Sequence, residues 1–257
     1  MAAIPVPSQL LGLPPIWREG RTALELAELL RDPVFREVDP GAGAERPVLL
    51  VPGFLAGDGS LGLMTGWLRR AGHRAHRTGI RLNVNCSARA LEVMERRVEN
   101  LAERYGRRVT IIGQSRGGTL GRALAVTRPD LVDVLVALGS PQLDPMAIHP
   151  LVKLQVGVLG VLGTLGAPGL FRESCLRGDC CGEYRGSFQT PFPDDVRYVS
   201  IYSRSDGIVD WRSCLDPAAE LVEVEATHIG MAMNAAVYRA VADALAPGHS
   251  AQIPLAA

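Results

Sequence analysis

The sequence predicts an α/β fold built on one mainly parallel sheet. Short continuous apolar runs, such as RPVLLV (46–51) and Leu131 to Leu138, are typical of strands that are buried on both faces. Helical segments alternate with these runs, and the clearest spans Ser87 to Tyr105, with apolar residues at 3-and-4 spacing and Gly106 as a stop. Such alternation indicates βαβ units with right-handed crossovers, which place helices on both faces of the sheet.

The other elements follow in chain order. The last helix is expected to carry Met233, Val237, Val241 and Leu245 on one face. Residues 1–257 are predicted to form a single domain, with residues 1–44 as an N-terminal extension. The remaining expected elements are helices near 21–31, at 61–71 and from 118 to about 127, and strands at 73–80, 109–112, 196–202 and 221–225.

Composition favours a folded protein that does not bind nucleic acid. Hydrophobic residues make up 47% and charged residues 21% of the 257, and Lys+Arg and Asp+Glu number 27 each. This balance predicts a sizeable core and gives no basic cluster for nucleic acid or an anionic membrane. The prolines and the lack of an early positive charge in MAAIPVPSQLLGLPP argue against a secretory signal, so a cytoplasmic protein is the default expectation.

Residues 144–195 interrupt the alternation. Their apolar, glycine-rich part, LVKLQVGVLGVLGTLGAPGLF (151–171), approaches the length of a transmembrane helix. However, Lys153 and Gln155 lie near its start, glycines and a proline weaken it, and strands of one sheet lie on both sides. We therefore expect an insertion that packs over the carboxyl edge of the sheet, where open α/β folds bind ligands.

The motif GQSRG (113–117) carries the main chemical signal. It follows the expected strand at 109–112 and precedes a helix, which is the setting required of a G-x-S-x-G nucleophile. Glycines two positions before and after Ser115 avoid a collision at a sharp turn. We therefore expect Ser115 to be a catalytic nucleophile rather than part of an ordinary glycine-rich turn.

A serine nucleophile needs a histidine base and an orienting acid. His228 follows the last expected strand, whereas His73 and His76 fall in a surface-like strand, His149 in the insertion and His249 in the tail. The expected acid is Asp206, on a turn before Gly207. Asp210 is its main rival and Asp144 a weaker one.

A tetrahedral intermediate needs backbone donors for its oxyanion. The loop in LLVPGFLAG follows an early strand, and Gly53 would let the amide of Phe54 face the site. The amide of Arg116, directly after the serine, is the second expected donor. The Arg116 side chain is expected to be a surface charge, with binding of an acidic group as the alternative.

Taken in order, VPGF, GQSRG, SDGIVD and THIGM resemble the α/β-hydrolase superfamily, in particular its lipase- and esterase-like members. The resemblance covers about residues 46–246. It implies an eight-stranded type of sheet, a Ser-Asp-His triad, and a lid or cap inserted after the sixth strand, a position that residues 144–195 match. The chain departs from many relatives at Pro52, where they have histidine before glycine, and at Gln114, where they have histidine before the serine.

These features predict a serine hydrolase that cleaves carboxylic esters of lipophilic acyl groups. A thioesterase or an acyltransferase with the same triad is the alternative, and a non-catalytic binding module is the third reading. The expected partners are small-molecule or lipid esters, with transient lipid-surface contact through the insertion left open. No dinucleotide, phosphate-loop or H-E-x-x-H motif occurs, so no cofactor is expected.

The cysteines are Cys86, Cys175, Cys180, Cys181 and Cys214. Their odd number favours free thiols, although a disulfide between CLRGDCC (175–181) and Cys214 is left open. Structural zinc sites usually combine a C-x2-4-C pair with a second pair or with histidines. A metal site is therefore not expected.

Overall fold

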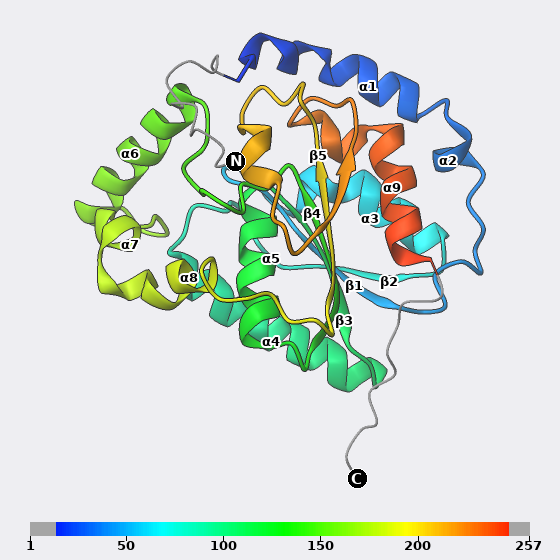
Figure 1. The fold of residues 1–257 in the computed structure, drawn as a ribbon, viewed down its shortest axis with the longest axis horizontal. Helices are drawn as coiled ribbons and strands as arrows, with labels where there is room; N and C mark the ends of the chain where they lie inside the picture. Colours follow the sequence, from blue (N-terminus) through cyan, green and yellow to red (C-terminus); the bar gives the residue numbers. More distant parts are fainter. Residues whose placement is uncertain (1–13, 247–257) are drawn as a thin grey trace, which may run out of the picture.

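One sheet of six parallel strands organises residues 14–246, which are the residues that the computed structural model describes (Figure 1). The strand order is β2-β1-β3-β4-β5-β6. The predicted α/β class with a mainly parallel sheet is confirmed. The strands are β1 Pro47–Val51, β2 Arg74–Arg77, β3 Val109–Gln114, β4 Val132–Leu138, β5 Arg197–Tyr202 and β6 Glu220–Glu223.

Helices cover both faces of this sheet (Figure 1). On one face, α1 (Thr22–Leu29), α3 (Gly62–Arg70) and α9 (Ala235–Leu245) share a core with Leu50 and Ile112. On the other face, α4 (Ser87–Tyr105) and α5 (Arg116–Thr127) share a core with Leu49 and Ile111. Alternate strand residues therefore serve opposite cores, which explains why the strands are apolar along their whole length.

The strand order indicates where on the sheet a ligand site is expected. The chain runs from β1 outward to β2 and then returns to the other side of β1 with β3, so the order reverses between β1 and β3. Open α/β sheets bind ligands in the crevice at the carboxyl ends of such strands. The segment after β1 is Pro52-Gly53-Phe54, and the segment after β3 begins with Ser115.

The N-terminal part is helical where the resemblance implies additional strands. Residues 14–246 contain six strands rather than eight, and the chain reaches β1 through η2 (Ile16–Arg21), α1 and α2 (Pro33–Arg36). The sequence supports these helices locally, because Asp32 accepts a hydrogen bond from the amide of Val34 and Pro33 stands in the first turn of α2.

Residues 144–195 connect β4 to β5, so the insertion follows the fourth described strand rather than the sixth. They form α6 (Pro150–Thr164), α7 (Glu173–Arg177), η4 (Asp179–Cys181) and α8 (Gly182–Ser187), which lie together at one side of the molecule (Figure 1). Within residues 14–246, no helix has both the length and the apolar character to span a membrane. The outer surface of α6 exposes Leu151, Leu154, Val158, Val161 and Leu162.

Candidate functional site

Ser115 occupies a strained turn between β3 and α5. Its φ and ψ are 52° and −122°, and positive φ is uncommon for a residue with a side chain. A Cβ added at Gly113 would lie 2.4 Å from the Gly117 carbonyl, and one at Gly117 would lie 2.2 Å from the Val51 oxygen. The two glycines therefore permit the backbone crossing that this turn requires.

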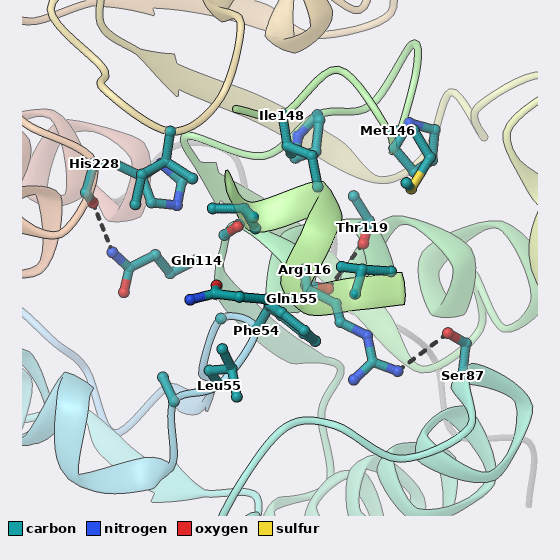
Figure 2. Close-up of a pocket in the computed structure, with 18 of the residues that line it drawn as sticks. Phe54, Leu55, Ser87, Gln114, Arg116, Thr119, Met146, Ile148, Gln155 and His228 are labelled. Carbon is teal, nitrogen blue, oxygen red and sulfur yellow. Dashed lines mark hydrogen bonds between the residues drawn. The ribbon is translucent and has the colours of Figure 1, made fainter. Parts of the chain in front are cut away.

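Ser115 and His228 line the same pocket, whose volume is about 530 Å³. Figure 2 shows this pocket, with His228 labelled among the side chains that line it. Such a volume is typical of a site for a small organic ligand. The loop after β1 contributes Phe54 and Leu55. Most other lining side chains are apolar, and the insertion supplies Met146, Ile148, Val152, Val156, Phe171 and Leu176 among them.

His228 and Asp206 meet at the carboxyl edge of the sheet. The Nδ1 atom of His228 lies 2.7 Å from Oδ2 of Asp206, and both residues are buried. The other carboxylate oxygen, Oδ1, accepts the amides of Ile208 and Val209 at 2.8 and 2.7 Å. These two amides fix the carboxylate so that Oδ2 faces the imidazole.

The rival acids have other partners. Asp210 accepts the amide of Arg212 and forms an ion pair with the side chain of the same residue. Asp144 accepts the amide of Met146. Of the three candidate acids, Asp206 is the one that pairs with the imidazole of His228.

The environment of His228 raises its pKa above the usual 6.5. Burial is the largest single effect and lowers the pKa of His228. The charge of Asp206 and its hydrogen bond to the ring, together with the charge of Glu19, raise it and outweigh burial. A positive imidazolium at this position is therefore stabilised by its surroundings.

Solved structures of other proteins share the fold of this chain. Neither a protein-family model nor a curated protein matches the sequence. The mature form of a lipase from Bacillus licheniformis superposes over 81% of this chain and 94% of its own, with a TM-score of 0.59 and 14% identity. A soluble variant of the monoglyceride lipase from Saccharomyces cerevisiae, in complex with a substrate analogue, covers 80% and 86%, with a TM-score of 0.58 and 14% identity. The chain has the α/β-hydrolase fold.

A monoacylglycerol lipase from Paleococcus ferrophilus also shares this α/β-hydrolase fold. It covers 78% of this chain and 95% of its own, with a TM-score of 0.53 and 15% identity. Identities this low establish the architecture alone. The roles of individual residues must therefore be argued from their geometry in this chain.

At the carboxyl edge of the sheet, Asn83 connects the two loops expected to supply oxyanion donors. Its Nδ2 donates to the carbonyl of Pro52 at 2.8 Å, and its Oδ1 accepts from the guanidinium of Arg116. A Cβ added at Gly53 would lie 3.2 Å from Cβ of Ser115, so the first loop packs closely on the serine. The amide of Arg116 opens α5 and has no acceptor within the helix.

The side chain of Arg116 does not lie at the surface as expected. It turns inward and donates to Ser87 Oγ at 3.1 Å (Figure 2). It also donates to the Asn85 carbonyl at 2.6 Å and to Asn83 Oδ1. Burial lowers the pKa of this guanidinium. The reason is that the fold brings two oxygens at the start of α4, on Asn85 and Ser87, next to the Arg116 guanidinium. Sequence alone does not show this proximity.

The other described histidines are His73, His76 and His149, and the prediction for His73 is wrong. His73 is buried rather than surface-like, and burial lowers its pKa to about 4. The Nε2 atom of His76 contacts the hydroxyl of Tyr105, and His149 accepts the amide of Leu151 at the start of α6. His249 lies outside the described residues.

Gln114 stands directly before Ser115, the expected nucleophile, and contacts His228, the expected base. Its Nε2 donates to the carbonyl of His228 at 2.9 Å (Figure 2). This hydrogen bond connects the end of β3 to the loop that carries His228.

Glu19 is a residue that sequence reasoning missed. Its Oε1 accepts the amides of Gly207 and His228, each at 2.9 Å, and its Oε2 accepts the amide of Ile229 at 2.9 Å. One carboxylate thus joins the acid turn to the histidine loop. Glu25 extends the same contact, because it accepts the amide of Thr227 at 2.8 Å.

We predict that Glu19→Gln lowers kcat by about 10- to 100-fold, the scale of a slightly misplaced catalytic group. The substituted amide would place a donor against the amide of Ile229. Loss of the negative charge would also lower the pKa of His228, so the acid limb of the kcat/KM profile should move to lower pH. Steady-state hydrolysis measured across pH tests both effects.

Glu28→Gln is the matched control, because Glu28 is an exposed acid on the neighbouring helix α1. The control should keep the wild-type profile. An acid limb that is the same in Glu19→Gln and wild-type protein would contradict the positioning role of Glu19.

Proposed function

We propose that the chain is a serine hydrolase that cleaves carboxylic esters of lipophilic acyl groups. The observation that carries this proposal is the strained Ser115 turn, which lines the same apolar pocket as His228, whose ring pairs with Asp206. Similarity to lipases gives further support at the level of the fold.

The proposed reaction begins when Ser115 Oγ attacks the ester carbonyl and His228 Nε2 takes the serine proton. Asp206 accepts the Nδ1 proton, which fixes the ring orientation and stabilises the imidazolium. The amides of Phe54 and Arg116 donate to the developing oxyanion. His228 then protonates the departing alcohol, and a water molecule, activated by the same base, hydrolyses the acyl-serine.

The pocket supports a lipophilic acyl chain as the substrate group. Its apolar lining can bury methylene groups, each of which contributes about 0.8 kcal/mol. The proposed donors to the carbonyl oxygen are the amide of Phe54, in the loop that packs on Ser115, and the amide of Arg116, which follows Ser115 in the chain. Acyl chain length is therefore expected to control turnover more strongly than the alcohol part of the ester.

We predict that Val152→Trp shifts the preference toward short esters. Val152 lines the pocket from α6, and the larger ring would occupy the space proposed for the distal acyl chain. The ratio of kcat/KM for dodecanoyl to butanoyl p-nitrophenyl ester should fall by about tenfold or more. Val158→Trp is the control, because Val158 is exposed on the same helix. An unchanged ratio in Val152→Trp would contradict the proposed binding mode.

Lipid-surface contact through the insertion stays a prediction. The exposed apolar residues of α6 lie on the helix that also lines the pocket, which favours entry of a substrate from a lipid phase.

A competing-alcohol assay distinguishes the proposed hydrolase from an acyltransferase. The proposed hydrolase should form mainly free acid. Predominant ester formation in water would instead favour the acyltransferase alternative.

A further inference from the structure

Four of the five cysteines form a cluster that the sequence does not suggest. The Sγ atoms of Cys86, Cys175, Cys180 and Cys181 all lie within 4.8 Å of one another. Cys86 directly precedes α4, whereas the other three belong to the insertion. The fifth, Cys214, is buried in a separate core with Tyr202 and Val209, so it is not placed to pair with them.

The spacing of the sulfur atoms fits a tetrahedral metal site better than a disulfide. Sγ of Cys86 and Cys181 are 3.4 Å apart, and those of Cys180 and Cys181 are 3.8 Å apart. A tetrahedron with zinc–sulfur bonds of about 2.3 Å has edges of about 3.8 Å, whereas a disulfide bond is about 2.05 Å long. All five cysteines are free thiols in the structure.

Backbone amides lie next to two of the cluster cysteines. Cys86 is the residue directly before α4, so the first amides of that helix, which have no acceptor within the helix, begin next to the cluster. The amide of Arg172 donates to Cys175 Sγ at 3.4 Å. Donors of this kind orient metal ligands and offset their negative charge.

The partly buried guanidinium of Arg116 contacts the residues on both sides of Cys86. The oxygens that it contacts, on Asn83, Asn85 and Ser87, are all neutral. Four thiolates around Zn²⁺ carry a net charge of −2, which would provide this guanidinium with a counter-charge.

We propose that Cys86, Cys175, Cys180 and Cys181 bind one Zn²⁺ ion and thereby fasten the insertion to the N-terminus of α4. Each thiol releases its proton to solvent as its sulfur binds, so no oxidant or reductant is involved. Zinc suits this set because tetrahedral thiolate sites select it. The site is structural, because all four positions belong to the protein. The sequence predicts no zinc site because CLRGDCC has no second cysteine pair nearby, and Cys86 is almost 90 residues away from it in the chain.

The test is the zinc content of the full chain, expressed in zinc-supplemented medium and purified under reducing conditions without chelator. We expect about one zinc ion per chain by elemental mass spectrometry.

A variant tests whether the cluster holds the ion. Cys180→Ser changes the exposed member of the cluster, so the variant should fold. Competition with a chromophoric chelator should show zinc affinity at least about tenfold weaker in this variant. Cobalt added to metal-free protein should give the visible bands of a tetrahedral thiolate site.

Cys214→Ala is the matched control and should keep both zinc content and affinity, because Cys214 lies outside the cluster. Alkylation of the denatured wild-type protein should modify all five cysteines. Wild-type protein that lacks zinc, contains iron instead, or forms a disulfide within the cluster would overturn the proposal. Zinc affinity unchanged in Cys180→Ser would also overturn it.

Discussion

Ser115→Ala is expected to lower kcat by about 10⁴- to 10⁶-fold, the scale seen when the nucleophile of a serine hydrolase is removed. The substitution deletes the atom that would form the acyl bond, while His228, Asp206 and the expected oxyanion donors stay in place. Hydrolysis of a p-nitrophenyl ester under saturating conditions measures the effect. Residual turnover within about tenfold of wild-type would contradict the assignment of Ser115.

A second substitution at this position separates catalysis from folding. Ser115 has a φ of 52°, and alanine would bear the same backbone strain. Ser115→Gly should relieve that strain and raise the free energy of unfolding by about 1 kcal/mol, measured by denaturant titration. Both variants should be inactive, but the glycine variant alone should be more stable than wild-type protein.

Asp206→Asn is expected to lower kcat by about 10³- to 10⁴-fold at neutral pH. The amides of Ile208 and Val209 would hold the asparagine oxygen in the place of Oδ1, so its amide nitrogen would face Nδ1 of His228. Nδ1 would then have to accept a hydrogen bond, the ring proton would sit on Nε2, and no base would face Ser115.

The pH profile of the wild-type protein follows from the same pair. His228 acts as a base only when neutral, and its pKa is raised above 6.5, so activity should fall as pH decreases through that raised value. Asp210→Asn is the control for Asp206→Asn, because Asp210 pairs with Arg212. Equal losses in the two variants would contradict the assignment of Asp206.

The fold and the central residues could be predicted because their signals are local. Strand β3, the glycines around Ser115 and helix α5 are contiguous in sequence, and steric crowding at one turn demands small residues there. His228 and Asp206 each follow a strand of a parallel sheet, and the carboxyl ends of parallel strands meet at one edge.

The supporting residues could not be predicted because their contacts join remote segments. Glu19 resembles an ordinary acid near a helix, yet it accepts amides from Gly207, His228 and Ile229. The inward turn of Arg116 depends on where the loop before α4 lies in the fold. The cysteine cluster likewise requires the insertion to fold back onto the start of α4.

The most direct test of the account is covalent labelling of the wild-type protein with a fluorophosphonate, followed by peptide mass spectrometry. The proposed mechanism predicts one adduct, on Ser115, whose formation slows as pH falls through the raised pKa of His228. Preincubation with a long-chain ester should protect the serine. Absence of an adduct on Ser115 in folded protein, or an adduct on another serine alone, would contradict the claim that this turn presents a catalytic nucleophile.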